Sequence, residues 1–331
     1  MSIRINKPLD LVIIGAGPIG LACAIEAKKA NLNYVILEKG CLVNSIFNYP
    51  VNMTFFSTSE RLEIGGVPFV SHGVKPTRRE ALEYYRRVVD AYKLRVHTYE
   101  RVENIEQEKD FFTVETIKRD YKCRNVIIST GYYDNVNCLK IPGEELKHKV
   151  FHYFKEAHPY AGKDVAVIGA GNSAVDVALE LYRTGARVTM IVREPEIKKS
   201  IKYWVRPDIE NRLKEQEIKS HFNSSVVKIT ERELFFEQNK KLHKIKNHFV
   251  FAMTGYHPDL SFLNKHGIKI EKNNCPYYNK KTLETNVKGL YLAGVVCGGM
   301  ETDKLFIENS IEHSEIIIKD ILKKSKSPLK K

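Results

Sequence analysis

The sequence predicts an α/β protein built from two Rossmann-like dinucleotide-binding domains, the second inserted within the first. Three observations predict this fold. A glycine-rich hexamer lies between an apolar run and a helical segment near the start of the chain, and the same arrangement recurs near the middle. Apolar runs that suit the sheet of the first domain lie on both sides of the second hexamer. A repeat of this kind is the pattern of two strand–turn–helix units.

The first unit begins with the apolar run Leu9–Ile14, and Gly15-Ala16-Gly17-Pro18-Ile19-Gly20 follows it. The alanine-rich segment Leu21–Ala30 predicts a helix, and the next apolar run, Tyr34–Leu37, ends in Glu38. In such a hexamer the first glycine makes a tight turn, the second lets the backbone approach a pyrophosphate, and the third allows close helix packing. The N–H groups at the start of the helix then meet the phosphates.

The second unit repeats each part. Asp164–Ile168 is apolar, the hexamer 169–174 (GAGNSA) follows, and a helical stretch extends to Thr184. The next strand, Arg187–Val192, ends in Arg193. One hexamer alone is weak evidence, but the complete arrangement present twice is strong.

The charge at the end of each second strand predicts the cofactors. Glu38 can accept hydrogen bonds from the ribose hydroxyls of FAD and would repel a 2′-phosphate. Arg193 offers a fork of donors that fits a phosphate, and Lys198 and Lys199 follow it closely. We therefore predict FAD in the first domain and NADPH in the second.

Two later segments belong to the first domain. Asn125–Ile128 is an apolar strand that leads into the segment 129–131 (STG), and Gly289–Ala293 is another that reaches Gly294. A helix is expected over Thr302–Lys319, and another over Thr77–Leu94 whose apolar side chains are spaced to bury one face. The predicted FAD-binding domain comprises residues 1–135 and 256–331, and the predicted NADPH-binding domain comprises residues 136–255.

Composition limits the class of protein, its location and its binding partners. The 331 residues are 43% hydrophobic and 28% charged, which is typical of a globular protein. No apolar run approaches the roughly 20 residues of a membrane helix, and the N-terminus lacks the pattern of a signal peptide. We therefore expect a cytoplasmic protein without a membrane partner. The net charge of +13 is spread along the chain and partly collected in Lys323–Lys331, so an anionic cofactor and substrate are expected rather than nucleic acid.

The cysteines lack the spacing of a redox or metal site. No CxxC occurs, which argues against a zinc ribbon or a thioredoxin-like dithiol, and no metal site is expected. Most of them are expected to be small buried residues. The six are Cys23, Cys41, Cys123, Cys138, Cys275 and Cys297.

Several longer segments carry a family resemblance. They resemble the low-molecular-weight thioredoxin reductase class, and more closely the YpdA-type bacillithiol disulfide reductases, over nearly the whole chain. The segments are 48–50 (NYP), 54–57 (TFFS), 151–160 (FHYFKEAHPY), 200–202 (SIK), 252–258 (AMTGYHP) and 305–309 (LFIEN).

The resemblance implies a thioredoxin reductase-like fold and a cytoplasmic homo-oligomer with FAD and NADPH. It also implies reduction of the disulfide of a low-molecular-weight thiol, with a small-molecule disulfide or a bacilliredoxin-like thiol protein as partner. The residues implied to contact FAD are Gly15, Gly17, Pro18, Gly20, Glu38, Lys39, Val102, Thr130, Gly131, Gly294 and Val295, with Asn48 and Thr54 on the loop expected to pass the ring system. Those implied to contact NADPH are Gly169, Gly171, Asn172, Ser173, Ala174 and Arg193.

The sequence departs from these families in two places. Thioredoxin reductases carry a CxxC just ahead of the second glycine motif, where this chain has His152–Tyr160 without cysteine. Many YpdA-type proteins carry a cysteine where this chain has Ile19, which removes disulfide exchange at that position. Val295, in place of the ribityl-binding Asp of thioredoxin reductases, is shared with the YpdA-type group.

No catalytic residue can be assigned from the sequence. Cys297 is a candidate thiol near the flavin, although a buried small residue is the simpler interpretation, and Cys23 is expected to pack against the sheet. His152 and His158 are candidate proton donors that also suit structural roles. Three other functions stay open: a ferredoxin- or quinone-type NADPH reductase, a flavin monooxygenase, and a non-catalytic redox sensor.

Overall fold

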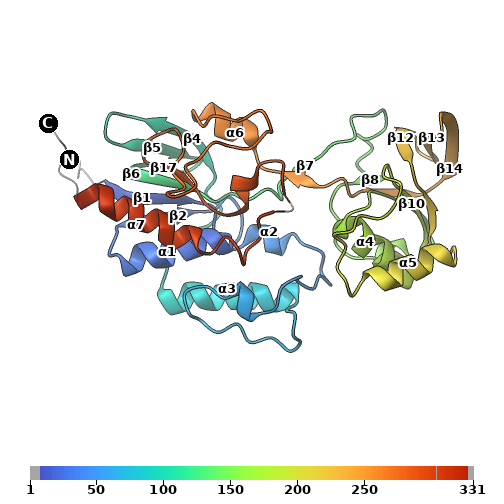
Figure 1. The fold of residues 1–331 in the computed structure, drawn as a ribbon, viewed down its shortest axis with the longest axis horizontal. Helices are drawn as coiled ribbons and strands as arrows, with labels where there is room; N and C mark the ends of the chain where they lie inside the picture. Colours follow the sequence, from blue (N-terminus) through green and yellow to red (C-terminus); the bar gives the residue numbers. More distant parts are fainter. Residues whose placement is uncertain (1–7, 303, 327–331) are drawn as a thin grey trace. The chain divides into compact units, whose positions relative to one another are not determined.

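The computed structural model describes residues 8–302 and 304–326, which divide into two compact units. The first unit holds the chain up to Asn48, Met53–Asn135, and the chain from His257 onward. The second unit holds Val136–Tyr256 together with the short segment Tyr49–Asn52. The chain passes between the units twice after residue 134, and these two passages pair as strands β7 (Asn135–Val136) and β16 (Tyr256–His257) (Figure 1).

The first unit is built on a seven-stranded sheet of order β3-β2-β1-β6-β5-β4, with β17 also paired to β6. The predicted strands β1 and β2 begin and end at the predicted residues, and they pair in parallel. The long strand β6 pairs antiparallel with β5 through its first half and parallel with β17 through its second half. The strands are β1 (Leu9–Ile14), β2 (Tyr34–Leu37), β3 (Val96–His97), β4 (Val102–Gln107), β5 (Phe112–Thr116), β6 (Asp120–Ile128) and β17 (Leu290–Leu292).

Helices α1 and α7 lie side by side against this sheet (Figure 1). The predicted helix over Thr77–Leu94 is confirmed as α3, which Thr77 caps by accepting from the N–H of Glu80 while the Glu80 carboxylate accepts from the N–H of Thr77. This reciprocal capping fixes where the helix begins. The helices are α1 (Pro18–Lys29), α2 (Asn44–Phe47), α3 (Arg78–Tyr92), α6 (Leu260–Lys265) and α7 (His313–Lys326), with short 3₁₀ turns η1 (Glu60–Leu62) and η3 (Gly294–Gly298).

The helix predicted over Thr302–Lys319 is wrong at its start. The last helix begins only at His313 and continues to Lys326. Ahead of it, Asn309 accepts a hydrogen bond from the N–H of Phe306 and donates one to the carbonyl of Lys304. An asparagine that bonds nearby backbone groups competes with helical hydrogen bonds, so this segment forms a loop. Residues 327–331 of the basic tail lie outside the described residues.

The second unit has a five-stranded sheet of order β11-β10-β9-β15-β8, in which every pair is parallel. A separate antiparallel sheet of order β12-β13-β14 was not anticipated from the sequence. The strands are β8 (Val150–Phe151), β9 (Asp164–Ile168), β10 (Arg187–Ile191), β11 (Lys219–His221), β12 (Ser224–Ile229), β13 (Glu233–Gln238), β14 (Lys241–Lys246) and β15 (Phe249–Ala252), and the helices are α4 (Asn172–Arg183), α5 (Arg206–Lys214) and the 3₁₀ turn η2 (His158–Tyr160).

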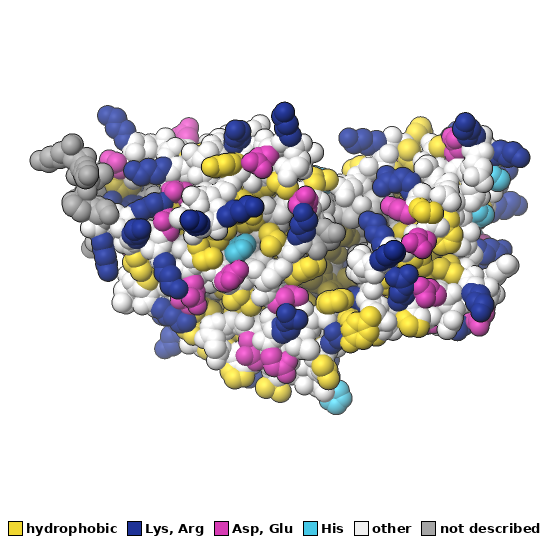
Figure 2. Space-filling model, viewed as in Figure 1, with side chains coloured by type: hydrophobic (Ala, Val, Ile, Leu, Met, Phe, Trp, Pro, Cys, Tyr) yellow, Lys and Arg dark blue, Asp and Glu magenta, His cyan; other side chains and the backbone are white. Residues whose placement is uncertain are grey.

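The positively charged side chains are scattered over the surface. On the face that Figure 2 presents, Lys and Arg side chains are spread over the chain with Asp and Glu among them. Within residues 8–302 and 304–326, no helix is both long enough and apolar enough to span a bilayer.

Candidate functional site

The first unit gathers its predicted site residues at one edge of its sheet. Strands β1, β2, β6 and β17 run parallel, so their carboxyl ends meet at the same edge. Gly15, Glu38, Thr130 and Gly294 follow these four ends. Ligands of doubly wound α/β sheets bind in the crevice outside the carboxyl ends of the strands.

The glycines of the first hexamer have different physical roles. A Cβ on Gly15, whose φ is +103°, would lie 2.7 Å from the carbonyl oxygen of Ser129, and one on Gly20 would lie 1.9 Å from that of Gly15. These two glycines are required by the packing of the chain itself. Gly17 has an ordinary φ of −72°, and among the described residues no atom beyond its near neighbours in the chain lies within 4 Å of the Cβ it lacks. The space beside Gly17, at the start of α1, is where a pyrophosphate fits.

Glu38 is buried directly beside this loop. Its Oε2 accepts from the N–H of Ala16 at 2.9 Å, and its Oε1 accepts from the N–H of Gly40 at 2.9 Å. Burial raises the pKa of Glu38, and the two backbone N–H groups oppose that rise. A carboxylate has about four lone-pair sites, so acceptor capacity is left for two ribose hydroxyls.

A strained residue ties helix α2 to the glycine loop. Val43 adopts left-handed backbone angles (φ 47°, ψ 48°) and donates its N–H to the carbonyl of Ala16 at 3.2 Å. A β-branched residue in this region is a true outlier, and such strain concentrates at functional sites. Val43 and Asn48 cap the two ends of α2, and the side chain of Asn48 donates to the carbonyl of Asn44 at 2.8 Å.

The other residues predicted to contact FAD lie on several different elements of the first unit. Lys39 forms an ion pair with Asp134 at 2.7 Å. Thr54 forms an isolated bridge with Thr77 ahead of α3, and Val102 starts β4 and packs on the core of the first unit. The structure thus brings the glycines and Glu38 together, whereas Thr54 and Val102 lie on other elements.

Ile19 packs directly beneath the turn that follows β17. A Cβ on Gly294, whose φ is +82°, would lie 3.1 Å from Cγ1 of Ile19. The N–H of Gly294 donates to Nδ1 of the buried His313 at 3.0 Å. Burial lowers the pKa of His313, which favours the neutral ring that can accept this bond. The position next to Gly294 is therefore filled by an aliphatic side chain.

The two cysteines near this site are poor thiolates. Cys297 is 2% exposed and Cys23 is fully buried. Burial raises the pKa of Cys297 well above its ordinary value and that of Cys23 to about 12. The thiolate is the nucleophilic form of cysteine, so burial disfavours nucleophilic attack by either side chain in this conformation. Of the other four, Cys138 is exposed and Cys123 is buried.

The second unit repeats the glycine geometry. A Cβ on Gly169, at φ +127°, would lie 2.5 Å from the carbonyl oxygen of Met253. Gly171 caps α4 with a φ of −88°, and the Cβ it lacks would have no non-local neighbour within 4 Å in the part of the chain that the structure describes. Ser173 is exposed in the first turn of α4, and Ala174 is buried against the loop. As in the first unit, open space remains at the start of the helix for a phosphate group.

A basic loop folds back onto this second glycine loop. The N–H of Lys198 donates to the carbonyl of Ala170 at 3.3 Å. Asn172 donates to the carbonyl of Ser200 and accepts from the N–H of Lys202, so its side chain already bridges the two loops. Arg193, two residues after β10, is 81% exposed and forms a long ion pair of 3.6 Å with Glu194. Lys198 and Lys199 are also exposed, whereas Lys202 pairs with Asp176 at 2.6 Å.

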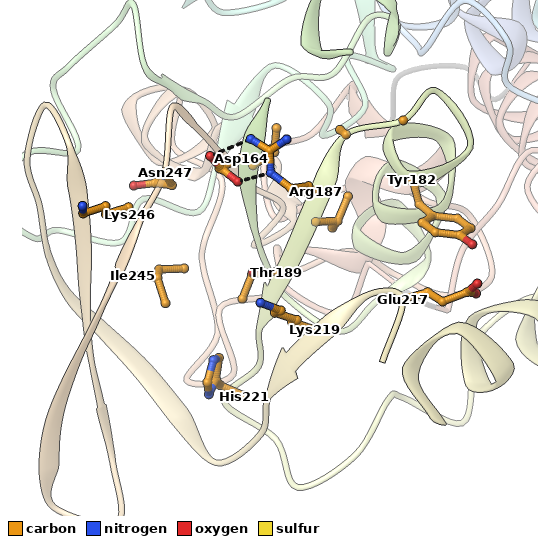
Figure 3. A pocket seen from close by; sticks show the side chains of 14 residues that line it. Asp164, Tyr182, Arg187, Thr189, Glu217, Lys219, His221, Ile245, Lys246 and Asn247 are labelled. Atoms are coloured by element: carbon orange, nitrogen blue, oxygen red, sulfur yellow. Dashed lines mark hydrogen bonds and ion pairs between the residues drawn. The ribbon is translucent and has the colours of Figure 1, made fainter. Parts of the chain in front are cut away.

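Figure 3 shows a pocket of about 550 Å³ elsewhere in the second unit. Asp164 and Arg187, which begin β9 and β10, line it, and Arg187 donates two hydrogen bonds to the Asp164 carboxylate at 2.6 and 2.9 Å. The pocket therefore lies at the amino ends of these strands, the edge opposite Gly169. It is not the dinucleotide site.

Comparison with known proteins agrees with the presence of two dinucleotide-binding glycine loops. The family model of the pyridine nucleotide-disulphide oxidoreductases matches residues 12–294. The chain belongs to this family. It is an oxidoreductase with the family's two Rossmann-like domains, and it binds a flavin and a nicotinamide nucleotide.

Individual relatives of this oxidoreductase cover nearly its whole length. It is 48% identical to the bacilliredoxin reductase Bdr of Bacillus subtilis, over 95% of this chain and 97% of the relative. The structure of the bacillithiol disulfide reductase Bdr (YpdA) from Staphylococcus aureus is 44% identical, covers 97% of this chain and 100% of its own, and matches with a TM-score of 0.94. Both findings confirm the YpdA-type resemblance.

A solved structure of lower sequence identity is evidence for the fold but not for the function. Thioredoxin reductase from T. acidophilum is 20% identical, covers 97% of this oxidoreductase and 100% of its own chain, and matches with a TM-score of 0.78. The thioredoxin reductase-like fold expected from the sequence is thereby confirmed.

Sequence reasoning named Asn172 and His152 but missed the interactions that they make, and it missed Val43 altogether. The bridge made by Asn172 and the left-handed backbone of Val43 depend on how neighbouring loops fold. An ion pair between Glu144 and His152, at 3.2 Å, was also missed because the two residues lie on different elements. Only the segment 151–160, already prominent in the sequence, gave a signal for His152.

Proposed function

We propose that this oxidoreductase is an NADPH-dependent FAD flavoprotein that reduces a low-molecular-weight disulfide of the bacillithiol type. The observation that carries the proposal is its similarity, over almost the entire chain, to proteins named bacilliredoxin reductase and bacillithiol disulfide reductase. The first unit would be the FAD-binding domain and the second the NADPH-binding domain. The protein would act in the cytoplasm as a homo-oligomer.

FAD is supported by the first unit's residues. The space beside Gly17 suits a pyrophosphate, and Glu38 suits the ribose of an adenosine, which FMN lacks. Purified protein should be yellow and should release FAD rather than FMN on denaturation, as chromatography of the supernatant would establish. Colourless protein that takes up no added FAD would contradict the proposal.

When both cofactors are bound, they supply hydride transfer from nicotinamide to flavin. The chain's own residues hold the two nucleotides, exclude water and orient the rings. Arg193, Lys198 and Lys199 support NADPH over NADH because their charges suit a 2′-phosphate.

The electron acceptor is the hardest part of the function to assign. Disulfide exchange proceeds by attack of a thiolate on sulfur. Ile19 offers none, and the thiols of Cys23 and Cys297 are buried with raised pKa values. We therefore propose that efficient disulfide reduction needs a bacilliredoxin-like thiol partner.

The test measures NADPH oxidation with oxygen alone, with bacillithiol disulfide, and with the disulfide plus a bacilliredoxin. Slow oxygen-linked consumption is expected alone, and fast turnover only with the partner present. Full disulfide turnover without a partner, by a variant lacking all six cysteines, would contradict the thiolate argument.

A ferredoxin- or quinone-type NADPH reductase is the second candidate. The burial of Cys23 and Cys297 favours it, because a flavin without a redox cysteine can still serve one-electron acceptors. Turnover with ferredoxin and none with the disulfide and its partner would support this alternative.

A further inference from the structure

One nitrogen of the His152 imidazole lies close to a carboxylate, and the other has no hydrogen-bond partner among the described residues. His152 directly follows β8, and its Nε2 lies 3.2 Å from Oε1 of Glu144. Its Nδ1 is buried and has no hydrogen-bond partner among the residues that the structure describes. Buried polar atoms of native proteins are nearly always paired, so this nitrogen requires an explanation, and one explanation is a ligand.

The ring is oriented before any ligand arrives. The carboxylate of Glu144 accepts from the N–H groups of Leu139 and Lys140, both at 2.6 Å, and the side chains of His152 and Glu144 are only 18% and 13% exposed. The hydroxyl of Tyr256 donates to the carbonyl of His152 at 3.1 Å, which also fixes the backbone. These contacts restrain Nε2 and the backbone of His152, and none of them involves Nδ1. A role for Nδ1 in binding a ligand is therefore compatible with all of them.

The strand order places His152 on a particular side of the glycine loop. Strands β8, β15 and β9 are parallel neighbours, so His152 and Gly169 follow strands at the same edge of the sheet. Arg193 follows β10, on the other side of β9. A dinucleotide crosses such an edge at the glycine loop, with its adenosine on the side of the strand after the glycine helix and its nicotinamide on the other side. His152 therefore lies on the nicotinamide side.

We propose that Nδ1 of His152 binds the carboxamide of the nicotinamide ring, an inference that rests on the proposed binding of NADPH to the second unit. With Glu144 ionised, the neutral ring carries its proton on Nε2, and Nδ1 accepts from the carboxamide NH₂. If the ring is doubly protonated, Nδ1 donates to the carboxamide oxygen instead. The carboxamide offers both groups, so either protonation state can form the contact, which requires Nδ1, buried in this conformation, to become exposed to the ligand.

The experiment compares NADP⁺ with 2′,5′-ADP, which has the adenosine and both its phosphate positions but no nicotinamide. Both are titrated into the FAD-loaded full-length protein. His152→Ala should weaken NADP⁺ binding about 2- to 12-fold, the effect of one lost neutral hydrogen bond, and leave 2′,5′-ADP binding unchanged. His148→Ala is the matched control and should change neither affinity, since the exposed His148 of the same unit also has its Nε2 near a carboxylate, 2.8 Å from Oε2 of Glu231.

Two conservative variants separate a ligand contact from a structural role. The amide of an asparagine reaches the position of Nδ1, whereas that of a glutamine reaches the position of Nε2. His152→Asn should therefore bind NADP⁺ more tightly than His152→Gln.

Equal losses of NADP⁺ and 2′,5′-ADP in His152→Ala, unchanged NADP⁺ binding, or the reverse order of the Asn and Gln variants would each overturn this inference alone. Wild-type protein that binds neither ligand would overturn the NADPH proposal and this inference with it.

Discussion

Arg193 is the residue that we predict to favour NADPH over NADH by its charge, and its side chain is 81% exposed. Arg193→Ala should weaken NADPH use about 10- to 150-fold, since a charge-assisted hydrogen bond is worth about 1.5–3 kcal/mol, while the weak use of NADH persists. Steady-state kinetics with both nucleotides measure this. Arg232→Ala, at an exposed arginine in the turn between β12 and β13, is the control. An equal loss with both nucleotides would mean that Arg193 is structural.

Cys297 provides a second test at the residue scale. Because burial raises the pKa of its thiol, Cys297→Ser should retain wild-type disulfide turnover with the thiol partner present. In the native protein, a thiol-labelling reagent should modify the exposed Cys138 well before Cys297, as mass spectrometry of peptides would measure. Loss of turnover in Cys297→Ser at unchanged FAD content would instead assign the thiol a role.

Individual site residues were predictable where their role depends on local sequence. The glycines, Glu38 and Arg193 follow strands directly, so their positions at the sheet edge could be inferred. The side chain of Asn172, predicted to contact NADPH, instead bridges to the segment 200–202, and its cofactor contact stays a prediction. No local pattern reports a bridge between two loops, because it depends on how both loops fold.

At the scale of the element, we expect the first glycine of the second glycine loop to be needed for stability and the second glycine to be needed for nucleotide binding. Gly169→Ala forces a side chain into a left-handed conformation and places its Cβ 2.5 Å from a carbonyl oxygen, so it should destabilise the protein by about 1–3 kcal/mol or more. The added Cβ of Gly171→Ala would have no non-local atom of residues 8–302 and 304–326 within 4 Å, so the unfolding temperature should be unchanged or slightly raised.

The same Gly171→Ala variant should nevertheless bind NADP⁺ weakly, because the added methyl group occupies the space for the pyrophosphate. Calorimetric unfolding and NADP⁺ titration together measure both effects. A variant that binds NADP⁺ normally would show that the nucleotide lies elsewhere.

Whole elements were predicted best where apolar runs are flanked by glycine signals. Strands β1, β2 and β9 begin and end at their predicted residues. The antiparallel strands β12–β14 were missed because β14 is polar and almost wholly exposed, while β13 buries only the alternate side chains Leu234 and Phe236 in a short segment. The late start of α7 was missed because the side chain of Asn309 competes with helical bonding ahead of it.

For the whole molecule, bound FAD should raise the free energy of unfolding. A ligand that binds only the native state, present at about 100 times its Kd, adds about 2.7 kcal/mol. Thermal unfolding of FAD-stripped protein, with and without added FAD, measures the gain. FMN at the same concentration should give a smaller gain, because the Glu38 side chain has no adenosine ribose to bind. Equal stabilisation by FMN and FAD would contradict the proposed role of Glu38.

The double pairing of β6 also affects the order in which the chain folds during synthesis. Its first half finds β5 as soon as residue 128 has emerged, but its second half, Val126–Ile128, waits for Leu290–Leu292. Nearly all of the second unit emerges in between, and domains generally fold as units during synthesis. Until β17 arrives, the nascent chain therefore presents an open apolar strand edge, a template for aggregation. A pause of the ribosome within residues 136–289 would prolong that exposure, and we expect it to lower the yield of soluble protein.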